Sequence, residues 1–93
     1  MSQQRAVQVR VTGRVQGVSF RVWTQAEARR LGLAGWVRNE RDGSVSALLV
    51  GPGEAVATMI ERLHAGPPGA RVADVRAEDV EQSEPPDGFR ITG

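Results

Sequence analysis

The segment GRVQGVSFR, residues 13–21, gathers residue types that can bind an anion. Gly13 and Gly17 can adopt backbone angles closed to other residues, so consecutive N–H groups can curve around a concavity. Arg21 ends the segment and offers a planar fork of donors. A phosphate group suits this set of donors. On spacing alone, the alternative stays open that the glycines only turn the chain and that Arg21 is a solvated residue.

Several other chemistries are excluded by residue counts. The chain has no Cys and a single His, His64, so thiolate nucleophiles, cysteine metal sites and paired histidines are all excluded. A nucleotide-binding P-loop needs a Lys after its second Gly, and the sequence contains no Lys. Net charge is +1, which offers no basic surface for a nucleic acid.

The composition predicts one folded domain spanning residues 1–93. Hydrophobic residues make up 40% and charged residues 25% of the chain, with both signs mixed, which is typical of a globular protein. The first dozen residues lack the apolar core of a secretory signal, and no window approaches the ~18 apolar residues of a membrane span. The expected location is the cytoplasm, with no membrane partner.

Hydrophobic periodicity places the anion-binding segment between a strand and a helix. Val7, Val9 and Val11 alternate with polar residues, which predicts a strand with one buried face. A helix is expected to begin near Arg21, because the apolar positions that follow recur along one helical face. The connection at 13–20 therefore leads into a helix N-terminus, where free N–H groups and the helix dipole favour an anion. The apolar positions are Phe20, Thr24, Ala28 and Leu31, and Gly32 ends the helix.

The rest of the chain predicts a hairpin, a second helix and further strands. Two short β-type runs flank Asp42 and Gly43, the dipeptide that most favours a tight hairpin. A second helix follows in GPGEAVATMIERLHAG, with Pro52 and Glu54 suited to its first turn and Gly66 at its end. Residues 70–80 alternate as another strand, with a last short strand at 89–92. The second helix buries Val56, Met59, Ile60 and Leu63, and the strand after it buries Ala73, Val75 and Ala77.

This order, β-α-β-β-α-β with a short β addition, predicts the α+β class. Two strand-helix-strand crossovers that share a hairpin give the ferredoxin-like split βαβ sandwich: one antiparallel sheet with both helices on one face. RNA-binding modules, metal carriers, regulatory domains and enzymes all use this fold, so the fold alone does not fix the function.

Two motifs carry a resemblance to a known family. GRVQGVSFR is followed, after a short amphipathic segment, by GLAGWVRNERDGSV at 32–45. This pair is similar to the two signatures of the acylphosphatase family. The resemblance extends over nearly the whole chain, through TQAEARRLGL, the GP before the second helix, GPPGARV after it and GFRI near the end.

The resemblance implies an enzyme without cofactor or metal that hydrolyses acyl phosphates to a carboxylate and inorganic phosphate. In that family, backbone amides of the loop and its final arginine hold the phosphoryl group, and an asparagine positions the attacking water. Here the arginine is Arg21 and the asparagine is Asn39. The implied phosphate-binding residues are Val15, Gln16, Gly17, Val18, Ser19, Phe20 and Arg21.

The residues suit this chemistry. A carboxylate whose acid has a pKa of roughly 4 to 5 is a good leaving group, so no general acid is required. The amide of Asn39 is neutral, so it can orient a water without needing a particular protonation state. An Asn near a hairpin can also do no more than form hydrogen bonds with the backbone of the turn. Glu40 and Asp42 are interpreted as turn residues. The chain departs from the family pattern at three positions. Ser19 is in a variable position, Glu40 stands where some relatives have a hydroxyl residue, and Gly93 stands where relatives commonly have an aromatic residue.

Two rival functions share the expected fold. An RNA-binding module would need stacking aromatics on its central strands, and none is present in the first strand or in SVSALLV. A module that binds a phosphate or carbamoyl phosphate group without turnover could use the same loop. The partners expected for the enzyme are a small acyl phosphate as substrate and inorganic phosphate as product and competitive ligand. The enzyme itself is expected to be a monomer. Acetyl phosphate, carbamoyl phosphate and 1,3-bisphosphoglycerate are all candidate substrates.

Overall fold

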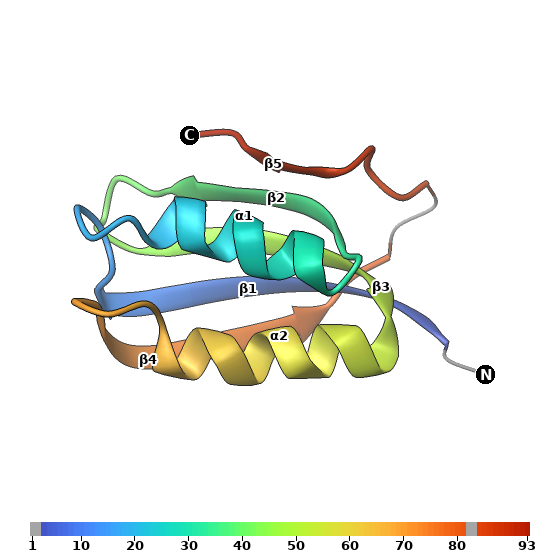
Figure 1. Ribbon diagram of the computed structural model, residues 1–93, viewed down its shortest axis with the longest axis horizontal. Coiled ribbons are helices and arrows are strands. Elements are labelled where there is room, and N and C mark those ends of the chain that lie inside the picture. The colour runs from blue at the N-terminus through green and yellow to red at the C-terminus, as the bar shows by residue number, and fades with distance from the viewer. Residues whose placement is uncertain (1–2, 82–83) are drawn as a thin grey trace.

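The computed structural model describes residues 3–81 and 84–93. The elements follow the order β1 (Gln4–Arg14), α1 (Phe20–Arg30), β2 (Ala34–Asn39), β3 (Val45–Pro52), α2 (Gly53–Ala65), β4 (Arg71–Asp79) and β5 (Phe89–Ile91). Both helices lie side by side on one face of the sheet (Figure 1). The predicted sequence of elements is confirmed, including the short strand at the end.

The sheet has the order β4-β1-β3-β2-β5. Neighbouring strands are antiparallel, except that β5 pairs parallel with β2. The expected antiparallel sheet is therefore correct for β1 to β4 and wrong for β5. After β4 the chain crosses to the opposite edge of the sheet at the same end, so β5 runs opposite to β4 and in the direction of β2 (Figure 1).

The core lies between the sheet and the helices. Val7, Val9 and Val11 on β1 are at most 1% exposed, as their alternation predicts. The two helices bury Phe20, Thr24, Ala28, Val56, Met59 and Leu63 against the sheet. Fully burying a Val, Leu, Met or Phe side chain stabilises a fold by about 1.5–3 kcal/mol. The core thus fixes β1 and α1, the two elements that flank the anion-binding loop.

A bulge interrupts the pairing of β1 with β4 between Thr12 and Gly13. Because of this shift, Val72 packs against the core together with Val75, whereas Ala73, which the alternation predicts to be buried, is exposed. Ala77, also predicted to be buried, is exposed as well. Gly13 has φ +119°, and a Cβ there would lie 2.2 Å from the carbonyl oxygen of the opposite strand. The end of β1 can approach β4 this closely only because residue 13 is Gly.

Candidate functional site

The predicted loop borders a cavity of about 370 Å³ at the start of α1. Its lining residues are Val15, Gln16, Gly17, Ser19, Phe20, Arg21, Val22, Asn39 and Ile91. The structure therefore brings Arg21 and Asn39 to one hollow together with all but one of the predicted loop residues. The exception is Val18, which packs against the core instead. Sequence reasoning missed Val22 and Ile91.

The loop backbone alternates in a way that gathers N–H groups. Gly17 has φ +75° and Ser19 has φ +61°, both in the left-handed region, with Val18 between them. Alternation of this kind turns successive amides toward a common concavity. The first turn of α1 carries no acidic side chain, so no protein carboxylate on that turn competes for these donors.

Ser19 is the residue that caps α1, and its side chain forms no capping hydrogen bond. The amide of Trp23 donates to the carbonyl of Ser19 over 3.1 Å, as expected for the start of an α-helix. The amides that precede Trp23 in the first turn consequently have no acceptor inside the helix. They add to the loop amides and to the positive end of the helix dipole, which makes this end of α1 suited to an anion.

Arg21 and Asn39 are held by the same backbone oxygen. The Arg21 guanidinium donates to the backbone oxygen of Gly93, and the backbone N–H of Asn39 donates to that oxygen over 3.2 Å. The residues after β5 thus lie between the helix start and the end of β2. Since a guanidinium has five N–H donors, this bond leaves Arg21 others for an anion.

The Asn39 side chain presents a free acceptor. Its Oδ1 is buried and accepts no hydrogen bond from the part of the chain that the structure describes. A buried acceptor without a partner costs about 1–3 kcal/mol, so this oxygen is disposed to accept from a small donor. Asn39 is the last residue of β2 and pairs with Val45, which fixes its backbone beside the cavity.

Gln16 ties the loop to the β2–β3 hairpin. Its Nε2 donates to the carbonyl of Glu40 at 2.8 Å and to the carbonyl of Ser44 at 3.0 Å. The hairpin is itself closed by the Glu40 amide, which donates to the Ser44 carbonyl at 2.8 Å. Since Glu40 follows Asn39, these bonds set the distance between the loop and Asn39. No sequence motif indicated this role for the Gln16 side chain.

The two acids of the hairpin have structural partners. Asp42 Oδ1 accepts from the Ser44 amide at 2.9 Å and from its hydroxyl at 2.6 Å, and these bonds hold the pKa of Asp42 below its ordinary value. Glu40 accepts from Arg38 Nε at 2.8 Å. This bond, followed by one from Ser46, lowers the pKa of Glu40. Both carboxylates therefore act as the turn residues that the sequence predicts.

The remaining polar and aromatic candidates lie away from the cavity. His64 is exposed in the last turn of α2. Trp23 packs edge-on against Phe20, with ring centroids 5.5 Å apart. Trp36 lies under the guanidinium of Arg38, 4.6 Å from the ring centroid. The described residues contain no group of three or more His, Cys, Asp or Glu that could hold a metal ion.

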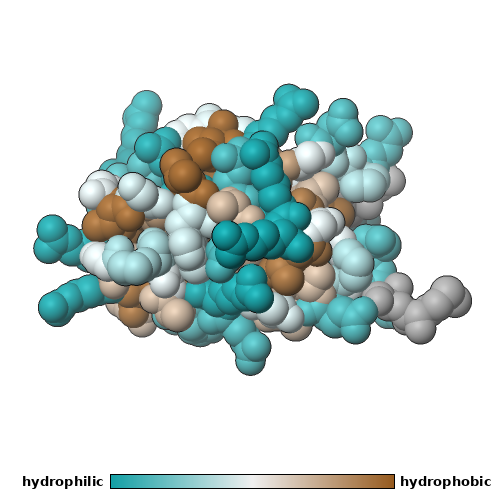
Figure 2. All heavy atoms as spheres, in the orientation of Figure 1, coloured by the Kyte–Doolittle hydropathy of each residue, from teal (hydrophilic) through white to brown (hydrophobic). Residues whose placement is uncertain are grey.

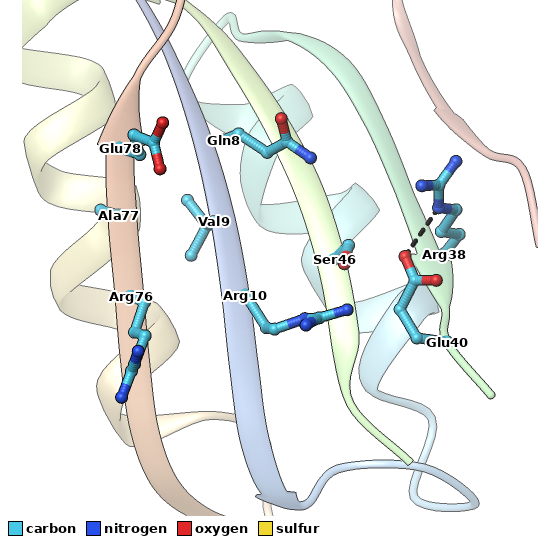
Figure 3. A pocket seen from close by; sticks show the side chains of 9 residues that line it. All are labelled: Gln8, Val9, Arg10, Arg38, Glu40, Ser46, Arg76, Ala77 and Glu78. Atoms are coloured by element: carbon cyan, nitrogen blue, oxygen red, sulfur yellow. Dashed lines mark hydrogen bonds and ion pairs between the residues drawn. The ribbon is translucent and has the colours of Figure 1, made fainter. Parts of the chain in front are cut away.

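A second hollow, about 770 Å³, lies on the face of the sheet that the helices leave uncovered. Figure 3 shows its side chains, with arginines on β1, β2 and β4. Each of these arginines faces an acid: Arg10–Asp42 at 3.9 Å, Arg38–Glu40 at 2.8 Å and Arg76–Asp74 at 3.1 Å. Because these charges are paired within the protein, this face is less suited to a polyanion than the loop cavity is to a single phosphate.

Among the residues that the structure describes, no helix is both long and apolar enough to cross a membrane.

Comparisons with known proteins converge on one family. The family model described as Acylphosphatase matches residues 7–91. A curated acylphosphatase of Rhizobium meliloti (strain 1021) is 62% identical over 88 residues, which are 95% of this chain and 93% of the relative. The crystal structure of acylphosphatase from Bacillus subtilis superposes with a TM-score of 0.92 at 36% identity, covering 98% of this chain and 100% of that one.

A larger protein contains a similar region. The crystal structure of full-length HypF in the phosphate- and nucleotide-bound form matches with a TM-score of 0.85 at 25% identity. The match covers 100% of this chain and 12% of that chain.

The bonds of Gln16 predict a stability effect. Gln16→Met keeps the length of the side chain and removes both bonds to the hairpin, so the free energy of unfolding should fall by about 1–2 kcal/mol in urea titration. Gln25→Met is the matched control, because within residues 3–81 and 84–93 Gln25 makes one such bond, to the carbonyl of Phe89, which Arg29 also contacts. The control should lose about half as much or less. Equal losses in the two variants would contradict the proposed clamp.

The left-handed backbone of Ser19 gives a second prediction. A β-branched residue is strongly disfavoured at φ +61°, so Ser19→Val should destabilise the protein by about 1–3 kcal/mol in thermal or urea unfolding. Ser19→Gly is the paired control and should be at least as stable as the native chain, since Gly adopts this conformation freely. A Val variant as stable as the Gly variant would show that residue 19 is not left-handed in solution.

Proposed function

Because the chain belongs to the acylphosphatase family, we propose that it hydrolyses acyl phosphates in the cavity between the 15–20 loop and Asn39. The observation that supports this assignment is that three features suited to phosphoryl transfer border the same cavity. These are amides curved by two left-handed residues, the Arg21 guanidinium and the Asn39 side chain, whose buried Oδ1 has no hydrogen-bond partner among the described residues. Each suits one requirement of phosphoryl transfer from an acyl phosphate to water.

The loop amides and Arg21 are proposed to hold the phosphoryl group. Phosphoryl transfer depends mainly on alignment and on stabilising charge at the three equatorial oxygens. Amides fixed in place by the chain do this without reorganising, and a guanidinium adds a bidentate contact. Loss of one such donor typically costs a hundredfold or more in rate. The loop residues in this role are Val15, Gln16, Gly17, Val18, Ser19 and Phe20, through their backbones.

Asn39 is proposed to orient the attacking water. Its Oδ1 accepts a hydrogen bond from the water, whose oxygen then forms a bond to phosphorus as the bond from phosphorus to the acyl oxygen breaks. The carboxylate leaves with the bonding electrons, and the water's protons pass to solvent and phosphate. A neutral amide at this position avoids repulsion between a carboxylate and the phosphate, which an acidic residue there would create.

The carboxylate leaving group removes the need for an acid catalyst. This agrees with the placement of His64, Glu40 and Asp42, none of which lines the cavity. The scheme uses no metal or cofactor, because the amides and Arg21 supply the neutralising charge. We further propose that residues 1–93 act as a single-domain monomer in the cytoplasm, that no nucleic acid takes part, and that inorganic phosphate competes with substrate.

A second candidate is a domain that binds a phosphate-bearing group without turnover. The similarity to a small part of the phosphate- and nucleotide-bound HypF supports this alternative. Near-complete coverage of an acylphosphatase chain by this one favours the enzyme. Steady-state hydrolysis of benzoyl phosphate by the purified protein distinguishes the two, since a binding module would show at most a slow single turnover.

Removal of either proposed side chain should give different losses. Arg21→Ala should lower kcat about a hundredfold or more and weaken inhibition by inorganic phosphate, because Arg21 contacts the phosphoryl group. Asn39→Ala should lower kcat by a similar factor while the inhibition constant for phosphate stays within about twofold. Benzoyl phosphate hydrolysis with phosphate as inhibitor measures both. Full activity in one variant would refute the role of that residue.

The pH profile is a further prediction. An asparagine amide is neutral and a guanidinium charged throughout the neutral range, so kcat/KM should be level from about pH 7 to about pH 9. Glu40 and Asp42 have pKa values below their ordinary 4.5 and 3.8, so their bonds stabilise the hairpin above that range. This stability is lost only as the pH falls through the lowered values. A steep change tracking one group near pH 7 would contradict the scheme.

A further inference from the structure

Two large apolar side chains are exposed among the described residues, and both belong to the same cavity. Val22 is 61% exposed and Ile91 is 37% exposed. Both line the hollow that contains Arg21 and Asn39. Scattered exposed apolar residues are ordinary on protein surfaces, but here the exposed pair coincides with the proposed site of an incoming substrate.

The fold places these two residues on one side of the loop. Val22 is in the first turn of α1, immediately after Arg21. Ile91 pairs with Val37, which is fully buried under the helices, so Ile91 also points to the helix side of the sheet. Figure 2, in the orientation of Figure 1, shows hydrophobic surface around the N-terminal end of α1, toward the side of β5.

The charges of the lining limit what the cavity can take. Among the described residues that line it, Arg21 is the only cationic side chain, and none has a side-chain carboxylate. One phosphoryl group uses the loop amides and this guanidinium. A second phosphate on the substrate would find no further cation among these lining residues, whereas an apolar body would cover Val22 and Ile91.

We propose that Val22 and Ile91 form an apolar wall that receives the acyl portion of the substrate. The enzyme then prefers acyl phosphates with an aromatic or aliphatic body over those whose acyl part is small or carries a second charge. This inference rests on the proposed function, because the position of the acyl group follows from a phosphoryl group held at the loop. Val22 and Ile91 determine specificity in this scheme and take no part in the bond changes.

The first measurement uses the unaltered protein with acetyl, propionyl and butyryl phosphate. The parent acids are similarly strong, so the leaving groups are nearly equivalent and differences report contact with the protein. Covering one more methylene is worth up to about a fourfold gain in kcat/KM. We expect kcat/KM to rise along the series and to be higher still for benzoyl phosphate. A flat or falling series would overturn the proposal.

The second measurement replaces an apolar branch by a hydroxyl at each position, a methyl group at Val22 and an ethyl group at Ile91. Val22→Thr and Ile91→Thr should each lower the ratio of kcat/KM for benzoyl phosphate to that for acetyl phosphate by about fourfold. Inhibition by inorganic phosphate should stay unchanged in both, since neither residue contacts the phosphoryl group. Both side chains are exposed, so folding is preserved, and circular dichroism checks this.

Val80→Thr is the matched control. Val80 lines a different hollow, with Gln4, Arg5 and Pro85, so the same chemical change there should leave the ratio unaltered. A ratio unchanged in the Val22 and Ile91 variants, with phosphate still a competitive inhibitor, would refute the apolar wall alone. Absence of phosphate inhibition in the unaltered protein would instead refute the proposed phosphate site.

Discussion

The structure depends on one constraint: a helix that begins directly after a strand exposes amides that the helix itself cannot satisfy. The loop between β1 and α1 keeps these amides turned inward at the expense of two left-handed residues, one of which is not Gly. Such a conformation persists only when its surroundings hold it. The buried Phe20 fixes one end of the loop, and the two bonds from Gln16 to the hairpin hold its middle.

The second constraint is the direction of the strands. β1 and β2 both run antiparallel to β3, and β5 runs parallel to β2, so these three strands end at the same side of the sheet. The loop follows β1, Asn39 ends β2, and Gly93 follows β5. Segments up to 72 residues apart in sequence therefore meet at this end of the sheet (Figure 1). The cavity therefore depends on the directions of the strands as much as on the sequence of the loop.

Much of this could be predicted from the sequence, because local patterns encode it. Alternating valines, helical spacing and the Asp42-Gly43 turn gave the elements, and the two signatures gave Arg21 and Asn39. The short strand β5 was itself predicted, but its direction and its contribution to the site could not be. A three-residue strand has no periodicity to read, and its parallel direction is decided by where the chain returns to the sheet. The site contacts of Ile91 and of the Gly93 backbone oxygen were missed for that reason, and Ala73 was misplaced because a bulge leaves no signature in spacing.

The backbone oxygen of Gly93 couples the order of Arg21 and Asn39 to the end of the chain. This one acceptor restrains both the guanidinium of Arg21 and the backbone of Asn39. It follows β5, a strand of three residues at the edge of the sheet. Edge segments of this size open locally far more often than the whole domain unfolds. When β5 frays, Arg21 and the amide of Asn39 lose this acceptor in the same event, whereas the pairing with Val45 still holds the backbone of Asn39. The conformational entropy of the Arg21 side chain therefore depends on the least stable part of the fold rather than on its valine core.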